Sequence, residues 1–179
     1  MAGLSLLAFV LLDPLLKLIA PGFDAETLAL TKTFSAIFLL APILHALSSV
    51  VSSILNTYKK FALMAVAPVL YNLGIILGIV WFYPTFGSPG IAFGVVIGAL
   101  LHLLIQVPQL FTLKFRYSLT IHLDKHFFDF WKLYWPRIFS MGTGQVTLLV
   151  ATFFGSFLAE GSLSAFYYAN NLHAVFLSI

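Results

Sequence analysis

The stretches TFSAIFLLAPILHALSSVVSSIL (33–55), NTYKK (56–60) and FALMAVAPVLYNLGIILGIVWFY (61–83) decide the fold of this chain. The first and third stretches contain no Lys, Arg, Asp or Glu. Each is longer than the roughly 20 residues that a transmembrane helix needs. The short polar stretch between them carries the basic pair Lys59 and Lys60. Together the three stretches predict two membrane-spanning helices joined by a tight turn.

The composition of the whole chain agrees with this prediction. Of its 179 residues, 61% are hydrophobic and 8% are charged, and the mean hydropathy is +1.03. Soluble domains contain about 25% charged residues, and a soluble core cannot enclose this much apolar surface. We therefore predict an all-α fold, a polytopic transmembrane bundle of about six helices. The charge-poor runs place these helices near residues 3–20, 33–56, 62–83, 91–113, 138–159 and 163–179.

Basic residues collect after every second predicted helix. The segments after the second and fourth helices contain Lys59, Lys60, Lys114, Arg116, Lys125, Lys132 and Arg137. The opposite ends carry only Lys17 and Lys32, so the positive-inside rule places the 56–60 turn in the cytoplasm. We divide the chain into a four-helix part (1–113), a cytoplasmic basic and aromatic interfacial connection (114–137) and a two-helix part (138–179), with Pro136 and Arg137 opening the fifth helix.

Several classes of function are disfavoured by what the sequence contains. The net charge of +3 lies at helix ends instead of on one basic face, which argues against nucleic-acid binding. The chain has no Cys, and it shows no Ser/His/Asp grouping or pair of intramembrane carboxylates. His122, Asp124 and His126 are spaced for neither one helix face nor a closed metal site. We therefore expect no enzyme, no metal and no cofactor.

Uncharged polar residues inside the predicted helices are the candidates for function, because each costs free energy in lipid unless it meets a partner or a wet cavity. An interhelical hydrogen bond is the alternative role for any one of them. The polar residues are His45, Asn72, His102, Gln106, Gln145, Thr147, Asn170, Asn171 and His173. From this set, and adding Ser164, we select as pathway residues Ser164, Asn170 and Asn171, with Asn72 and Gln145 behind them.

Several stretches, in order along the chain, resemble one family, the MurJ (MviN) lipid II flippases of bacteria, within the multidrug/oligosaccharidyl-lipid/polysaccharide exporter superfamily. The stretches are APGFD (20–24), ILNTYKKF (54–61), APVLYNLG (67–74), GIAFGVVIGAL (90–100), WPR (135–137) and EGSLSAFYYA (160–169). The resemblance implies transport of lipid II, a lipid-linked peptidoglycan precursor, from the inner to the outer leaflet of the cytoplasmic membrane. It further implies alternating access between two helical lobes, with this chain similar to the third to eighth helices of the family.

The chain departs from the family pattern at three positions. Asn170 and Asn171 stand where the family typically has an acidic residue and an arginine, and Ala151 stands where some members carry an acid linked to sodium. Because a diphosphate headgroup calls for cationic partners, we expect the chain to need the missing helices of a full transporter. The alternatives are a related polysaccharide or drug exporter, a truncated remnant that does not transport, and, least favoured, an integral membrane enzyme.

Overall fold

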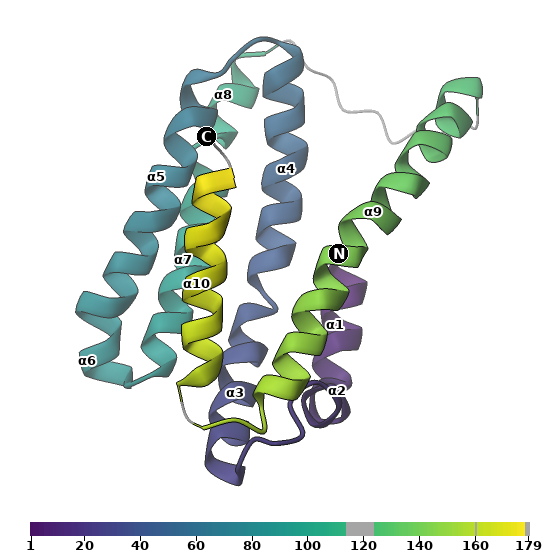
Figure 1. Ribbon diagram of the computed structural model, residues 1–179. Helices are drawn as coiled ribbons and strands as arrows, with labels where there is room; N and C mark the ends of the chain where they lie inside the picture. The colour runs from purple at the N-terminus through teal and green to yellow at the C-terminus, as the bar shows by residue number, and fades with distance from the viewer. Residues whose placement is uncertain (114–123, 160, 178–179) are drawn as a thin grey trace. The chain divides into compact units, whose positions relative to one another are not determined.

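The computed structural model describes residues 1–113, 124–159 and 161–177. The described residues form helices and no strand, which confirms the predicted all-α class (Figure 1). The chain divides into two compact units. The first comprises residues 1–13 and 28–117, and the second comprises residues 14–27 and 118–179.

Prolines decide where several of the helices end. A proline has no N–H, and its ring clashes with the carbonyl four residues earlier, so the preceding helix stops there. The helices that end four residues before a proline are α1 (Ala2–Val10, before Pro14), α3 (Ala25–Phe38, before Pro42) and α7 (Pro89–Leu104, before Pro108). Helix resumes shortly after as α2 (Leu12–Ile19), α4 (Ala41–Thr57) and α8 (Val107–Phe111). The expected first helix at 3–20 is therefore two short helices.

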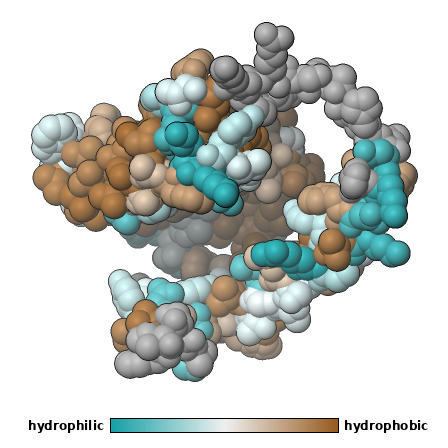
Figure 2. Space-filling model, turned by 90° about the horizontal axis from the view of Figure 1, so that it is seen from above, coloured by the Kyte–Doolittle hydropathy of each residue, from teal (hydrophilic) through white to brown (hydrophobic). Residues whose placement is uncertain are grey.

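Four helical stretches among the described residues are long and apolar enough to cross a membrane, and α1 with α2 forms a fifth if the broken pair is one span. The four stretches are Ala25–Thr57, Ala62–Phe86, Pro89–Phe111 and Phe127–Gly155. Seen end-on, apolar side chains cover much of the surface and hydrophilic ones gather in a few patches (Figure 2). This confirms a multi-pass membrane protein, although with four or five described spans where we expected six.

A seam of glycines joins two neighbouring helical stretches of the first unit. One stretch consists of α5 (Ala62–Leu77), the π-helical turn η1 (Gly78–Phe82) and α6 (Tyr83–Phe86), and it runs beside α7 (Figure 1). Gly74 and Gly78 meet Gly94 and Gly98 so closely that a Cβ on any of them would press on the opposite backbone. Such close approach lets van der Waals contacts form between helix backbones in lipid. These four glycines therefore act in helix packing.

The second unit contains one long helix where we expected an interfacial helix followed by a transmembrane helix. This helix, α9 (Lys125–Gly155), continues through Pro136, so the segment expected to be interfacial and the span expected from residue 138 belong to one helix and no new helix starts there. Prolines are tolerated inside membrane helices where neighbouring groups satisfy the freed backbone carbonyl, and Pro136 is such a proline. Asp124 caps its first turn by accepting a hydrogen bond from the Phe127 N–H at 3.0 Å. The last helix is α10 (Ser162–Leu177).

Candidate functional site

A buried network of uncharged polar side chains lies between α4 and the α7–α8 break in the first unit. Gln106 is fully buried and Ser48 is 1% exposed. The Gln106 amide nitrogen donates to Ser48 Oγ at 2.8 Å and to the His102 carbonyl at 2.9 Å. Ser52 Oγ donates to the Gln106 carbonyl oxygen at 2.5 Å, so both ends of this amide are paired. The network therefore ties α4 to α7 inside the membrane part of the chain.

The spacing of the polar residues along each helix explains how the network forms. Ser48 and Ser52 are four residues apart on α4, so both lie on one helix face. His102 lies in the last turn of α7, and Gln106 precedes α8 at the break, where its side chain folds back onto the His102 carbonyl. At the break before Pro108, the Gln106 N–H donates to the Leu103 carbonyl at 3.1 Å. The His102 carbonyl accepts from the Gln106 side chain instead.

The His102 ring also belongs to this network. Ser48 Oγ and His102 Nδ1 lie 2.7 Å apart and form a hydrogen bond whose donor depends on the tautomer of the ring. The His45 ring lies edge-on to the His102 ring, with 5.5 Å between the ring centroids, and the Tyr71 ring lies 5.2 Å from His45. Helices α4, α5, α7 and α8 contain no acidic residue, so the network holds helices together and has no carboxylate for acid–base chemistry.

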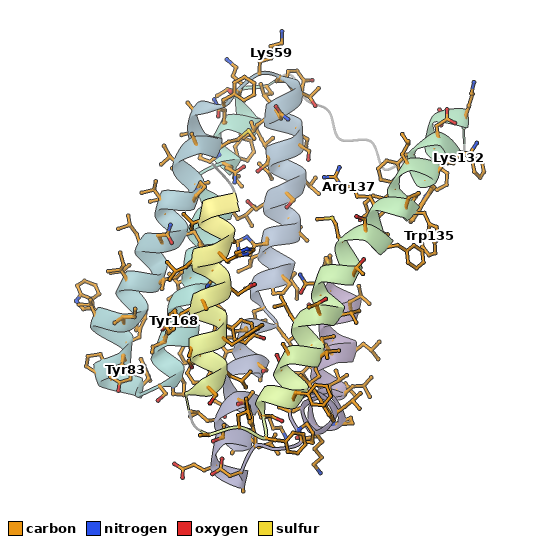
Figure 3. The ribbon with its side chains drawn as sticks, viewed as in Figure 1. Lys59, Tyr83, Lys132, Trp135, Arg137 and Tyr168 are labelled. Atoms are coloured by element: carbon orange, nitrogen blue, oxygen red, sulfur yellow. The ribbon has the colours of Figure 1, made fainter. Side chains whose placement is uncertain are left out.

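The predicted pathway residues of the second unit lie mainly on the exposed surface of α10. Ser164, Tyr168 and Asn171 follow one another at spacings of four and three residues, which places them along one face of this helix. Asn170 is also exposed, but it lies about 100° around the helix from Asn171. Tyr168 points outward from α10 (Figure 3). The structure thus brings Ser164 and Asn171 onto one face and leaves Asn170 on another.

The remaining two predicted residues are exposed on other helices. Gln145 lies on α9 of the second unit, and Asn72 lies on α5 of the first unit. The Asn72 amide donates to the Pro68 carbonyl of its own helix at 3.0 Å. Pro68 lies inside α5 without ending it, and the exposed Asn72 side chain binds the carbonyl of this proline on its own helix.

A cavity of about 350 Å³ opens in the second unit beside the chain segment that precedes α3, and Ser164 contributes to its wall. The Gly22 N–H donates to Ser156 Oγ at 3.1 Å, and Ser156 is 5% exposed. Asp24 also lines this cavity, and hydrogen bonds from Thr27 hold the pKa of its carboxyl group below the ordinary value of 3.8. The cavity is therefore polar on one side and carries an ionised carboxylate at neutral pH.

Clusters of side chains that could hold a metal ion are not found in the part of the chain that the structure describes. No group of three or more His, Cys, Asp or Glu side chains is close enough there to hold a metal ion. The His122-x-Asp124-x-His126 sequence lies partly outside the described residues, because the structure does not describe His122. The described polar groups instead form hydrogen bonds between and within helices.

Comparison with known families decides which kind of membrane protein carries these helices. A family model described as lipid II flippase MurJ matches residues 1–179, all of this chain. The chain belongs to the MurJ family. Family membership confirms the resemblance carried by the six sequence stretches, and it places the helices described above in a family of membrane transporters.

Three relatives show how much of a MurJ protein this chain represents. A probable lipid II flippase MurJ of Buchnera aphidicola is 35% identical over 159 residues, covering 86% of this chain and 31% of the relative. Proteins of the same description from Aquifex aeolicus (30% identical, 99% of this chain and 36% of the relative) and Haemophilus influenzae (29% identical, 86% and 30%) also match. The chain spans about a third of the length of these curated MurJ relatives.

In this MurJ family chain, sequence reasoning missed the importance of the buried network. His102 and Gln106 stood among the polar residues of the predicted helices but were not selected as site residues. The signal that could have found them is the four-residue spacing of both pairs, Ser48 with Ser52 and His102 with Gln106, next to the Pro108 break. A polar pair on one face of a transmembrane helix predicts a hydrogen-bonded interface with a second such pair.

Proposed function

We propose that this chain forms part of a bacterial lipid II flippase in the cytoplasmic membrane. In this proposal the complete transporter moves the lipid-linked peptidoglycan precursor from the inner to the outer leaflet by alternating access. The observation that carries the proposal is the match of the lipid II flippase MurJ family model to all 179 residues. The apolar helices, which are long enough to span a bilayer, support the same membrane role.

The charge distribution indicates what this chain contributes to such a transporter. Helices α4, α5, α7, α8 and α10 contain no Lys or Arg. A diphosphate headgroup in a membrane cavity needs cationic partners, and Arg suits bidentate contact with phosphate oxygens. We therefore assign these helices a scaffold and polar-lining role, with Asn72 on α5 and Ser164, Asn170 and Asn171 on α10. Gln145 would add to the polar lining from α9, which carries Lys125, Lys132 and Arg137 in its first half. The cationic contacts would come from other segments of the transporter.

A chimeric transporter tests this function directly. The matching segment of the Aquifex aeolicus relative is replaced by this chain, because the two align over 99% of its length. We expect vesicles with the chimera to move fluorescent lipid II to the leaflet that an impermeant quencher reaches, whereas residues 1–179 alone do not. A chimera that folds and inserts like its parent yet leaves lipid II in place would overturn the proposal.

The α10 residues are tested in the same chimera. We expect Asn171→Leu to slow lipid II movement about tenfold, because a hydrogen bond to a charged group contributes about 1.5 kcal/mol or more. Asn170→Leu is the matched control on the other face, and we expect a smaller loss from it. Equal losses from the two variants would contradict a pathway along the Ser164–Asn171 face.

We propose further that the turn between α4 and α5 faces the cytoplasm. Lys59 lies at this turn, and Tyr83 lies at the opposite end of the α5–α6 stretch (Figure 3). The chain has no native Cys, so single cysteines report without background. We expect Lys60→Cys to be shielded from an impermeant thiol reagent in intact cells, and Ser88→Cys to react. Permeabilised cells serve as the control, since both positions should then be labelled, and the reverse pattern in intact cells contradicts the orientation.

A further inference from the structure

An apolar groove in the first unit runs between α1 and the later part of α3, continuing to the start of α4. It consists of two adjoining cavities of about 590 and 430 Å³ that share Phe9 and Ala36 in their walls. One cavity joins residues 2–9 of α1 to residues 36–43, and the other joins residues 9–13, at the end of α1 and the start of α2, to residues 32–37. The two sides of the groove therefore run antiparallel. The apolar wall includes Leu6, Phe9, Ala36, Leu39, Leu40 and Ile43.

An ion pair closes one end of this groove. Lys32 Nζ lies 2.7 Å from both carboxylate oxygens of Asp13, and both side chains belong to the groove wall. The Lys32 and Asp13 side chains are 50% and 62% exposed. An exposed pair of this kind contributes little to stability, so its charges are available to a ligand at little cost to the fold.

The position of the ion pair along the span matches the depth of lipid headgroups. From Lys32 to Thr57, at the turn with Lys59, a helix rises about 38 Å, compared with about 30 Å of hydrocarbon and 40–45 Å with headgroups. Lys32 and Lys59 therefore lie near opposite membrane surfaces. From Lys32 to Ile43 the rise is about 16 Å, about half of the hydrocarbon thickness. The groove is thus as long as one leaflet is deep.

We propose that this groove binds one phospholipid with a zwitterionic headgroup that ends in a primary ammonium, in the leaflet opposite the Lys59–Lys60 turn. Lys32 contacts the lipid phosphate, Asp13 accepts hydrogen bonds from the ammonium, and one acyl chain lies along Phe9 and Ala36. The two protein charges cancel, which suits a zwitterion and disfavours an anionic lipid or a diphosphate beside Asp13. A primary ammonium has three N–H donors for the carboxylate, whereas trimethylammonium has none. The site is separate from the proposed transport of lipid II.

Native mass spectrometry of the chain released from detergent tests the proposal. The chain is incubated with phosphatidylethanolamine, phosphatidylcholine or phosphatidylglycerol that carry identical acyl chains. We expect phosphatidylethanolamine to be retained about fivefold more than either of the others, the ratio typical of one partly exposed charge contact. Equal retention of the three lipids, or a preference for phosphatidylglycerol, overturns the proposal.

Variants separate headgroup recognition from binding of the acyl chain. Asp13→Asn should abolish the preference for phosphatidylethanolamine over phosphatidylcholine, and Asp13→Glu should keep it. Ala36→Phe should lower retention of all three lipids, because it fills the groove. The matched control is Glu26→Gln, which removes an exposed carboxylate of α3 outside the groove and should change nothing. An unchanged lipid preference in Asp13→Asn with a wild-type unfolding temperature overturns the assignment.

Discussion

Replacing Gly94 by leucine is expected to lower the unfolding temperature of the chain by about 10 °C. Inserting extra side-chain atoms into a packed interface costs about 3 kcal/mol when the opposing atoms belong to a backbone. A Cβ on Gly94 would lie 2.9 Å from the Gly74 carbonyl oxygen, and a Cβ on Gly78 would lie 2.6 Å from the Gly94 Cα. These neighbours are backbone atoms, which cannot rotate away as a side chain can. The helices α5 and α7 would therefore have to separate.

The matched control for this substitution is Gly144→Leu on α9. A Cβ at Gly144 meets no atom within 4 Å, so the leucine enters open space. Leucine is favoured over glycine in a helix by about 0.8 kcal/mol, so we expect an unchanged or slightly raised unfolding temperature. The measurement is size-exclusion chromatography of fluorescently tagged protein after heating in detergent. Equal losses from the two variants would contradict the glycine seam.

Replacing Gln106 by methionine is expected to destabilise the chain by about 2 kcal/mol, although the two side chains have similar volumes. The change removes the partner of Ser52 Oγ and the donor to the His102 carbonyl. A buried polar group left without a partner costs about 1–3 kcal/mol, whereas a typical hydrogen bond within a membrane contributes about 0.6 kcal/mol. The unpaired groups, more than the lost bonds, should account for the effect.

The control for Gln106→Met is Gln145→Met, which makes the same change at an exposed position of α9 and should be nearly neutral. The double variant Ser48→Ala with Gln106→Met provides a second measurement by the same heating assay. Ser48 Oγ accepts from the Gln106 amide at 2.8 Å. The loss of stability in the double variant should therefore be smaller than the sum of the losses in the two single variants. Additive losses would show that the two residues do not share a network.

The positions of the helices could be predicted largely from the sequence, because charge and proline act locally. The charge-free runs at 33–55 and 61–83 predicted the spans that the structure contains as Ala25–Thr57 and Ala62–Phe86. The expectation of a helix start at residue 138 was wrong, because Pro136 lies inside α9. A proline ends some helices and is tolerated in others, depending on whether the residues around it keep the helix packed.

The candidate sites were less accessible to sequence reasoning. Asn72 stays a predicted pathway residue, and the sequence did not indicate that its amide donates to the Pro68 carbonyl of the same helix. Gln106 appeared to be one polar residue among several, and it proved to be the fully buried centre of a network. Both contacts depend on which face of a helix packs against another helix. When a transmembrane helix is apolar on all sides, its sequence does not indicate which face that is.

The sequence by itself determined that this is an all-α membrane protein of the MurJ family and approximately where its helices lie. A bilayer has a fixed thickness and offers no hydrogen bonds to the backbone, so long apolar runs must become helices wherever they occur. Only the tertiary structure decided that Ser48 meets Gln106, that Gly78 meets Gly94, and that Asp13 and Lys32 close one groove. These contacts join residues far apart in the sequence, and helix rotation and packing determine them.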